Sequence, residues 1–243
     1  MQSNNEVIVR LVNVSKIYRV GNIITWGLRN VNLEVRRGDF LAVMGPSGSG
    51  KTTLLNIMGL LDKPTKGEVF IDGLPTSRLK SSVIAKIRNR RIGFVFQFFN
   101  LVNRLTVLEN IELPLVPRGI PRKVRVKLAV EALLKVGGDV SWLNKKPYQL
   151  SGGQQQRVAI ARAIVTKPTL ILADEPTGNL DRKSSKQVVK TFIDLNSMGQ
   201  TIVVVTHDPE VANCTRKILI IRDGKIIGAE EPNHEKCIVN TVA

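Results

Sequence analysis

The order of apolar and polar residues predicts a strand-rich start of the chain. Residues 6–14 alternate loosely, residues 31–35 alternate cleanly and residues 40–44 form an unbroken apolar run, and each pattern predicts a short strand. Apolar residues recur at helical spacing in residues 52–61, and residues 68–71 predict one more strand. The first part of the chain therefore combines several strands with a helix.

The middle of the chain is predicted to be mainly helical. Helical spacing covers residues 78–90, residues 106–113 up to Pro114, and residues 122–136, with an apolar strand at residues 92–96 among them. Strands and helices then alternate, with helices expected at residues 154–166 and 182–196, strands at 170–173 and 201–206, and a hairpin at 218–227.

This alternation favours an α/β fold with a mostly parallel sheet, because parallel strands need a crossover connection that a helix usually supplies. We expect residues 1–243 to form a single domain. Residues 1–77 and 150–243 would form its core, and about residues 78–149 would form a helical insertion.

The charge of the chain is unusual for its otherwise ordinary globular composition. There are 36 Lys and Arg residues against 20 Asp and Glu residues, a net charge of +16. Residues 78–146 hold 15 of the basic and 4 of the acidic residues, a net of +11. An anionic partner is therefore expected, and a nucleic acid, an anionic membrane surface and nucleotides all qualify. A solvated basic face is the alternative.

Location and redox state are indicated by what the sequence lacks. The longest aliphatic runs are about four residues, far short of the roughly 20 that span a bilayer. Residues 1–5 do not resemble the start of a secretory leader, which favours a cytoplasmic location. Cys214 and Cys237 lie far apart without metal-ligand spacing, so we expect two free thiols in a reducing compartment.

Residues 45–52 read GPSGSGKT and fit the phosphate-binding loop pattern, between an apolar strand and a helix as that pattern requires. Small residues let backbone N–H groups curl around phosphate oxygens, and the helix N-terminus adds partial positive charge. Lys51 would reach the β- and γ-phosphates of ATP, and Thr52 would bind Mg²⁺. A purely structural glycine loop is the alternative. The predicted nucleotide-binding residues are Gly45, Pro46, Ser47, Gly48, Ser49, Gly50, Lys51, Thr52 and Thr53.

Two acidic residues, Asp174 and Glu175, end the apolar strand of residues 170–173. In an enzyme with a phosphate-binding loop, Asp174 would hold Mg²⁺ and Glu175 would polarise the water that attacks the γ-phosphate. The alternative is that one of them caps the next helix, but Pro176 and Gly178 favour a loop there.

A second possible anion site begins the helix predicted near residue 154. Residues 150–154 read LSGGQ, which places a serine and two glycines directly before the helix. The hydroxyl of Ser151, the amides of Gly152, Gly153 and Gln154, and the helix dipole are suited to one anion. An ordinary capped helix would need only the serine.

With these motifs in this order, the chain resembles the nucleotide-binding subunit of an ATP-binding cassette (ABC) transporter over nearly its whole length. The resemblance implies a P-loop NTPase core with an N-terminal antiparallel β subdomain and a helical subdomain insertion. It implies that Tyr18 stacks on adenine, that Gln97 senses Mg²⁺ and the attacking water, and that His207 contacts the γ-phosphate. Asp181, in GNLD, would belong to the D-loop.

Without the resemblance, ordinary structural roles fit three of these residues. Tyr18 would be a half-buried strand residue, Gln97 a loop residue and Asp181 a helix N-cap. His207 differs, because it follows the β-branched run of residues 202–205 at a strand end, where α/β proteins collect ligands.

The resemblance also implies partners. The LSGGQ segment of one subunit would complete the nucleotide site of another, in an ATP-dependent homodimer. Integral membrane permease subunits would receive the resulting movement, which places the chain peripherally on the inner face of the cell membrane. The GNLD motif, the segment NL at residues 100–101 and the segment ENIELPL at residues 109–115 resemble the lipoprotein-releasing and macrolide-exporting branch, of the LolD and MacB type.

A cassette ATPase that acts on nucleic acid, in repair or translation, is the alternative function. The net charge would suit it, but such proteins usually carry two cassettes or a long coiled-coil insertion, and the sequence has neither. An apolar cluster around Gln97 also suits a groove for a partner helix better than a phosphate track. We therefore favour transport. The cluster consists of Phe94, Phe96, Phe98, Phe99 and Leu101.

Overall fold

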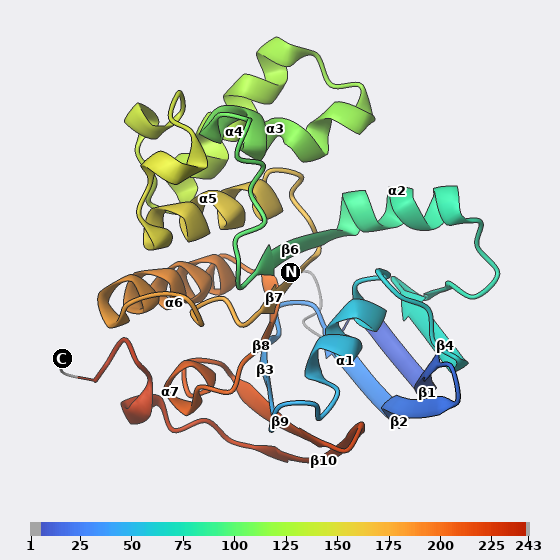
Figure 1. The fold of residues 1–243 in the computed structure, drawn as a ribbon. Coiled ribbons are helices and arrows are strands. Elements are labelled where there is room, and N and C mark those ends of the chain that lie inside the picture. The colour runs from blue at the N-terminus through green and yellow to red at the C-terminus, as the bar shows by residue number, and fades with distance from the viewer. Residues whose placement is uncertain (1–5, 242–243) are drawn as a thin grey trace.

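The computed structural model describes residues 6–241 as an α/β fold built on two sheets (Figure 1). The smaller sheet is antiparallel and has the strand order β2-β1-β4-β5. It confirms the expected β subdomain. Residues 1–5, on which the expectation of a missing leader rests, lie outside the described residues. The strands are β1 (Val7–Val20), β2 (Ile23–Arg36), β4 (Lys66–Ile71) and β5 (Leu74–Pro75).

The larger sheet has the order β10-β9-β3-β8-β7-β6, and all neighbouring pairs are parallel except β10 with β9. Apart from Thr201 and Asp174, its central strands β3, β7 and β8 are apolar, because helices or strands cover both of their faces. The expected mostly parallel sheet and C-terminal hairpin are confirmed. The strands are β3 (Phe40–Met44), β6 (Ile92–Phe96), β7 (Leu170–Asp174), β8 (Thr201–Val205), β9 (Lys217–Arg222) and β10 (Lys225–Glu230).

Within residues 6–241, six helices form where helical spacing predicts them, with shifted ends, whereas the short helix α7 was not predicted. Thr106 and Glu109 form a capping box that fixes the start of α3. The expected strand within the middle segment, β6, pairs with β7 and so belongs to the larger sheet. The helices are α1 (Lys51–Met58), α2 (Ser81–Arg91), α3 (Val107–Glu112), α4 (Arg122–Lys135), α5 (Gly152–Ile164), α6 (Arg182–Ser197) and α7 (Pro209–Ala212). Four 3₁₀ turns are η1 (Leu113–Arg118), η2 (Val140–Trp142), η3 (Pro147–Gln149) and η4 (His234–Lys236).

The larger sheet lies between two main hydrophobic clusters. One contains side chains such as Ile160 of α5 and Phe192 of α6, together with residues of α3 and α4. The other contains Leu54 of α1 and residues of the smaller sheet such as Val14. Helix α1 and helix α5 therefore pack on opposite faces of the larger sheet (Figure 1). Within residues 6–241, no helix combines the length and apolarity that a membrane crossing requires.

The strand register determines where the site forms. Val43 of β3 and Asp174 of β7 both lie opposite Val205 of β8, and Phe96 of β6 lies opposite Asp174. Because these strands are parallel, the loops that follow them all leave from the same edge of the sheet.

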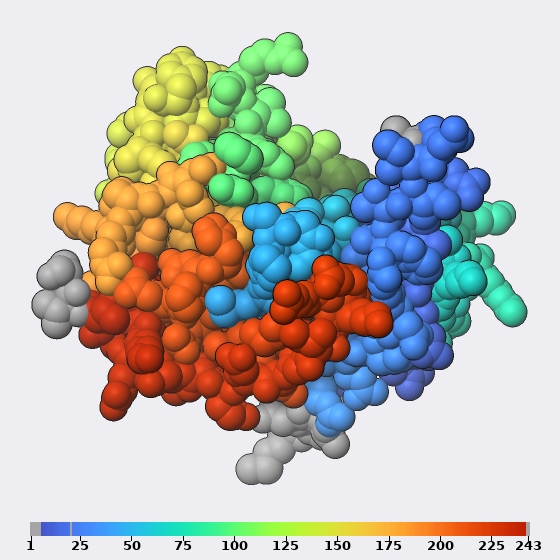
Figure 2. All heavy atoms as spheres, turned by 60° about the horizontal axis from the view of Figure 1, so that its bottom comes forward, coloured from blue at the N-terminus to red at the C-terminus, as the bar shows by residue number. Residues whose placement is uncertain are grey.

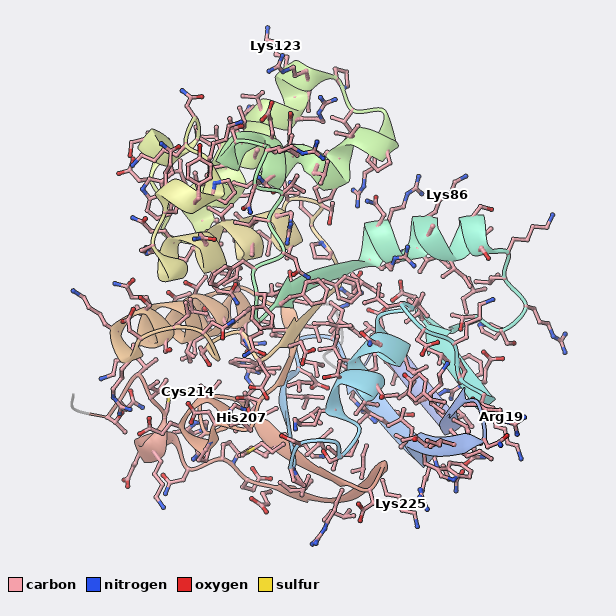
Figure 3. All side chains as sticks on the ribbon, viewed as in Figure 1. Arg19, Lys86, Lys123, His207, Cys214 and Lys225 are labelled. Carbon is pink, nitrogen blue, oxygen red and sulfur yellow. A yellow bond between two sulfur atoms is a disulfide. The ribbon has the colours of Figure 1, made fainter. Side chains whose placement is uncertain are left out.

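The expectation of two free thiols is wrong. Cys214 and Cys237 form a disulfide, with their Cα atoms 4.7 Å apart (Figure 3 labels Cys214). The β9–β10 hairpin reverses the chain between them, so residues 233–241 return to the side of α7, where the backbone N–H of Ile238 donates to the carbonyl of Glu210. The separation of 23 residues in the sequence did not indicate that the two cysteines lie close together. The described part of the C-terminal tail is therefore locally packed.

Candidate nucleotide-binding and hydrolysis site

The phosphate-binding loop has the backbone that its glycines allow. A Cβ atom at Gly45 would lie 2.1 Å from the carbonyl oxygen of Ile221, and one at Gly50 would lie 2.4 Å from that of Gly27. Gly50 has φ 107° and is the N-cap of α1, without any side-chain cap. The first N–H groups of α1 therefore have no capping side chain, as an anion site requires.

The side chains of Lys51 and Ser49 lie within the phosphate-binding loop. Lys51 donates from Nζ to the carbonyls of Gly45 and Pro46, at 2.7 and 3.0 Å. The buried hydroxyl of Ser49 has no hydrogen-bond partner among residues 6–241. The carbonyl of Ser49 accepts from Gly224, in the turn of the β9–β10 hairpin, at 2.9 Å. Figure 2 shows this hairpin in red, beside the strands of the smaller sheet in blue.

Thr52 and Asp174 bring two oxygen ligands together at the sheet edge. The hydroxyl of Thr52 donates to Asp174 Oδ1 at 3.5 Å. Burial raises the pKa of Asp174 and the charge of Glu175 adds to this, whereas Thr52 and Lys51 oppose it. No cluster of three His, Cys, Asp or Glu residues within residues 6–241 could hold a metal. Two hard oxygen donors nevertheless fit Mg²⁺, which keeps waters and takes phosphate oxygens as further ligands.

Glu175 and His207 form the next pair along this edge. His207 Nδ1 lies 3.0 Å from Glu175 Oε1, and the backbone N–H of His207 donates to Oε2 at 3.4 Å. The side chain of His207 is 71% exposed and that of Glu175 is 16% exposed. Glu175 has φ 47°, an uncommon conformation for a residue other than glycine, and its N–H donates to the carbonyl of Val205. Glu175 is thus held in the loop and is not a helix cap.

Tyr18 lies beside the start of α1. A Cβ atom at Gly27 would lie 2.8 Å from Tyr18 Cε2 and 2.9 Å from Thr53 Cγ2, so Gly27 leaves room for both side chains. The hydroxyl of Tyr18 donates to Asp62 Oδ2, and the ammonium of Lys16 lies 5.0 Å from the ring centroid. The tyrosine ring is therefore fixed next to the phosphate-binding loop.

The LSGGQ segment lies apart from the phosphate-binding loop, because α5 packs against β6, α3, α4 and α6 on the other face of the sheet. Ser151 is the N-cap of α5 and accepts from the N–H of Gln154, whose side chain accepts from the N–H of Ser151 in return. Gly153 packs against Ser184, since a Cβ atom there would lie 2.7 Å from its hydroxyl. Gly152 faces Leu180.

Gln97 and Asp181 form hydrogen bonds with other residues of this chain, Asn179 and Ser184. The side-chain amide of Gln97 donates to Asn179 Oδ1 at 3.3 Å, and Asn179 donates back to the carbonyl of Gln97. Asp181 is the N-cap of α6 and accepts from the N–H and hydroxyl of Ser184, which lowers its pKa. The structure therefore links the loop that contains Gln97, which we call the Q-loop, to the D-loop, and it shows the capping role of Asp181.

Sequence reasoning missed two residues that hold these loops. Gln156 is fully buried and donates to the carbonyls of Pro176 at 2.7 Å and Phe96 at 3.3 Å. The sequence alone could not tell which of the three consecutive glutamines faces the core.

Arg162 is the second missed residue. It donates to the carbonyls of Phe99 and Asn100, which have φ values of 60° and 50°, so it fixes a strained part of the Q-loop. Burial lowers the pKa of Arg162 to about 10. No local pattern in the sequence marks it, because the carbonyls that it contacts lie 62 and 63 residues away along the chain.

The apolar residues near Gln97 do not form one continuous surface. The rings of Phe94 and Phe96 stack at 5.8 Å and line a groove of about 400 Å³ that Arg162 also lines. Phe98 is 73% exposed, and Leu101 packs against the core.

The profile of the ABC transporter family matches residues 28–178. The chain is 52% identical over 224 residues to an uncharacterized ABC transporter ATP-binding protein of Thermotoga maritima, covering 92% of this chain and 95% of that protein. It is 46% identical over 221 residues to the lipoprotein-releasing system ATP-binding protein LolD of Aquifex aeolicus, covering 91% of this chain and 96% of LolD.

A further relative carries more than a cassette. The chain is 49% identical over 221 residues to the macrolide export ATP-binding/permease protein MacB of Syntrophobacter fumaroxidans, covering 90% of this chain and 31% of MacB. Among solved structures, the dimeric ABC transporter cassette MJ0796 of Methanocaldococcus jannaschii has a TM-score of 0.86 and 48% identity, covering 93% of this chain and 99% of that one. MJ0796 is also known as a dimer in a post-hydrolysis state bound to ADP and Pi.

These similarities confirm the resemblance and the fold class expected from the sequence, and they support a transporter subunit over an ATPase that acts on nucleic acid. The chain belongs to the ABC transporter family, as an ATP-binding and ATP-hydrolysing subunit.

Proposed function

We propose that this subunit hydrolyses Mg²⁺-bound ATP at the edge of its larger sheet, within a homodimer that drives a separate membrane permease. The observation that carries the proposal is the convergence of the phosphate-binding loop, the Thr52–Asp174 pair and the Glu175–His207 pair at one strand edge. Lys51 would exchange its two carbonyl partners for the β- and γ-phosphates.

Hydrolysis requires that a water attacks the γ-phosphorus while the bond to the leaving ADP oxygen breaks. Glu175 would accept the proton of that water, and its bond to His207 orients its carboxylate. Mg²⁺, held by Thr52 and Asp174, would neutralise the phosphate charge when bound. Gln97 would turn from Asn179 toward the metal and the water, and Tyr18 would stack on adenine.

The second nucleotide contact would come from a partner subunit. Ser151 is exposed at the N-terminus of α5, on the face of the sheet opposite to α1, which supports contact with another copy's ATP. In this arrangement Ser151, Gly152, Gly153 and Gln154 would bind the γ-phosphate of the partner's ATP, and Asp181 would lie at the dimer interface.

The groove lined by Phe94, Phe96 and Arg162 would receive a helix of the permease. Because Arg162 also holds the Q-loop carbonyls, a helix seated there would touch the residue that fixes the loop after Gln97. We also propose that the subunit belongs to the branch that LolD and MacB represent and that it lies on the inner face of the cell membrane.

An anionic membrane surface is the proposed partner of the basic middle segment. One pocket is lined by Lys86, Arg90, Arg91 and Arg118, and Arg91 pairs with Asp72 at 3.2 Å. Within residues 6–241, Lys86, Arg90 and Arg118 form no ion pair. Burial, and then the charge of Arg90, lowers the pKa of Arg118. Lys86 extends from α2 away from the body of the molecule (Figure 3).

The variant Glu175→Gln tests the hydrolysis proposal. It retains size but removes the base, so ATP turnover should fall by roughly 10²–10⁴-fold while ATP binding persists. Sedimentation should then find monomers without nucleotide or with ADP, and dimers with ATP. The matched control is Glu131→Gln, an exposed residue of α4, which should turn over ATP like the wild type. Full turnover in Glu175→Gln would contradict the role of Glu175, and a monomer under ATP would contradict the dimer.

Vesicle sedimentation tests the membrane proposal. The wild type should bind phosphatidylglycerol vesicles and release them as salt rises, and Lys86→Glu/Arg90→Glu should bind several-fold less. Lys217→Glu/Lys225→Glu, on the β9–β10 hairpin, makes the same change of charge elsewhere and should retain more binding than Lys86→Glu/Arg90→Glu. Equal loss in both variants would mean that only net charge matters.

A further inference from the structure

The short helix α7 follows His207, which we call the switch histidine, and the hydrogen bonds within so short a helix cannot by themselves hold it in place. It has four residues, far fewer than an isolated helix needs in water. Asp208 caps it by accepting from the N–H of Glu210 at 2.8 Å, and the N–H of Asp208 donates to Thr206. Val211 and Ala212 pack in the core, whereas the partly exposed Glu210 takes its anchor from outside the helix.

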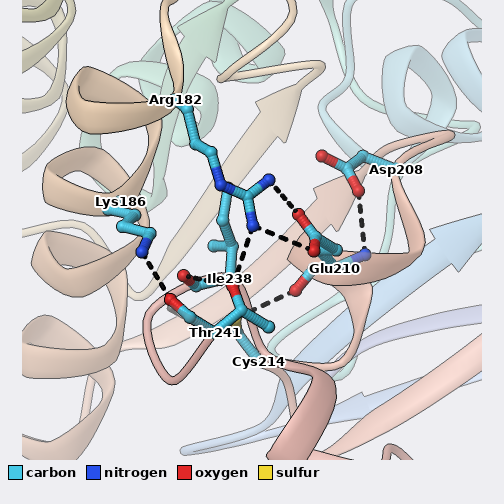
Figure 4. Close-up of polar contacts among 7 residues, drawn as sticks. All are labelled: Arg182, Lys186, Asp208, Glu210, Cys214, Ile238 and Thr241. Carbon is cyan, nitrogen blue, oxygen red and sulfur yellow. Dashed lines mark hydrogen bonds and ion pairs between the residues drawn. The ribbon is translucent and has the colours of Figure 1, made fainter. Parts of the chain in front are cut away.

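Arg182 provides that anchor from the D-loop side. It is the first residue of α6, directly after Asp181, and its guanidinium makes a bidentate pair with Glu210 at 2.7 and 3.1 Å (Figure 4). Their side chains are 47% and 34% exposed, so the pair adds little to stability. Its planar geometry nevertheless fixes the orientation of α7 relative to α6.

Residues 233–241, which we call the strap, close over this pair. Thr241 accepts from Arg182 Nη2 through its hydroxyl at 3.0 Å, and its carbonyl accepts from Lys186 at 2.5 Å. The N–H of Ile238 donates to the carbonyl of Glu210 at 3.0 Å. Figure 4 shows that Arg182 and Lys186 reach the strap from α6 while Glu210 reaches it from α7.

The disulfide closes the strap covalently on α7. Cys214 lies just beyond α7 and Cys237 lies within the strap, and both are buried. The strap can therefore leave α7 only locally while the disulfide is intact, which keeps Thr241 and Ile238 near Arg182 and Glu210.

We propose that Arg182 and Glu210 are positioning residues that couple the D-loop to the switch histidine, and that the disulfide-closed strap holds them in register. The catalytic consequence rests on the proposed function. A partner subunit that moves the D-loop would, through this pair, also move His207 against Glu175.

Two measurements on Arg182→Gln and Glu210→Gln test the coupling. The chain has two histidines, so the imidazole NMR signals of His207 and His234 can be followed directly. The His207 signal should shift in both variants even without nucleotide. The kcat for ATP should fall, roughly tenfold, with KM and melting temperature near those of the wild type. The charge-exchanged variant Arg182→Glu/Glu210→Arg should recover part of the loss.

The matched control is Lys190→Gln, which removes another exposed ion pair of α6, Lys190–Asp194. It should change neither His207 nor kcat. For the strap, dithiothreitol, which closes to a cyclic disulfide as it delivers two electrons and two protons to the sulfurs, should shift His207 in the wild type. Cys214→Ser/Cys237→Ser should show that shift without reductant and no further response.

The results separate the two levels of the proposal. An unmoved His207 signal in Arg182→Gln and Glu210→Gln would overturn the coupling, whatever the turnover. A shifted signal in a chain whose wild type hydrolyses no ATP would uphold the mechanical coupling and contradict the proposed function instead. An unchanged His207 signal after reduction would remove the strap from the mechanism.

Discussion

Tyr18 is held by contacts that separate its ring from its hydroxyl. The ring lies next to Gly27, whereas Asp62 accepts from the hydroxyl. The ring and the hydroxyl can therefore be altered independently, which makes the stacking proposal testable at a single residue.

We expect Tyr18→Ala to weaken ATP binding by roughly 1–3 kcal/mol, the increment typical of base stacking on an aromatic side chain. Tyr18→Phe keeps the ring and should bind ATP within about twofold of the wild type, because it loses only the bond to Asp62. Calorimetry measures both affinities. The other tyrosine, Tyr148, is exposed in η3, and Tyr148→Ala is the control. Equal affinities for Tyr18→Ala and Tyr148→Ala would mean that adenine stacks elsewhere.

Asp174 illustrates a conflict between stability and function. Burial and the charge of Glu175 raise its pKa in the folded protein above the unfolded value. The ionised carboxylate is thus disfavoured on folding: the stability contributed by its protonated form is complete below the unfolded pKa and is lost as pH rises through the folded pKa.

We therefore expect Asp174→Asn to raise the melting temperature at pH 7 without nucleotide or Mg²⁺, by about 2–4 °C for each kcal/mol gained. The gain should shrink in acid, below the unfolded pKa, where the wild-type carboxyl is also protonated. Thermal melts at pH 7 and in acid measure this difference, and Asp194→Asn, at an exposed position of α6, is the control. A lower melting temperature for Asp174→Asn at pH 7 would refute the argument. The same variant should bind Mg²⁺–ATP poorly, because it loses a metal ligand.

At the scale of elements, the start of α5 serves two roles that the sequence could not separate. Ser151 and Gln154 form a capping box, so removing Ser151 would disturb the helix as well as any phosphate contact. A substitution that keeps the cap and changes the charge distinguishes the two, since aspartate caps a helix about as well as serine.

We expect Ser151→Asp to leave the unfolding free energy within about 0.5 kcal/mol of the wild type, because its carboxylate can accept from the N–H of Gln154. In the Glu175→Gln background, the added charge should repel the γ-phosphate and abolish the ATP-dependent dimer. Denaturant unfolding and sedimentation check the two halves. A dimer that persists in Ser151→Asp would assign Ser151 to capping alone.

At the scale of the whole molecule, the disulfide links the end of the chain to the layer that carries the site. It closes a loop with a sequence separation of 23 residues. Cross-linking a loop of this length should stabilise the folded chain by roughly 3 kcal/mol, because it restricts the unfolded state.

Denaturant unfolding with and without dithiothreitol measures this contribution. The oxidised wild type should lose roughly 3 kcal/mol on reduction, and Cys214→Ser/Cys237→Ser should match the reduced protein. The reductant should have no effect on that double variant. Unfolding that does not respond to reduction in the wild type would show that the disulfide adds no stability.

The sequence by itself determined where most helices and strands form and which local motifs they carry, although β1 and β2 are longer than predicted. Residues 40–44 and 92–96 form strands with the predicted bounds, because an unbroken apolar run needs burial on both faces. The phosphate-binding loop was predictable for a related reason: Gly50 has φ 107°, a backbone conformation that favours glycine. Such constraints act between neighbours along the chain, and the sequence records them directly.

The tertiary structure alone decided which distant residues meet. Parallel register brings Asp174 opposite Val205 and so sets Glu175 against His207, 32 residues further on. Chain reversal at the β9–β10 hairpin joins Cys214 to Cys237, which their spacing did not indicate. The pairing of Arg182 with Glu210 likewise exists only because α6 and α7 lie side by side. Such contacts depend on the packing of whole layers, and no local pattern of residues encodes that packing on its own.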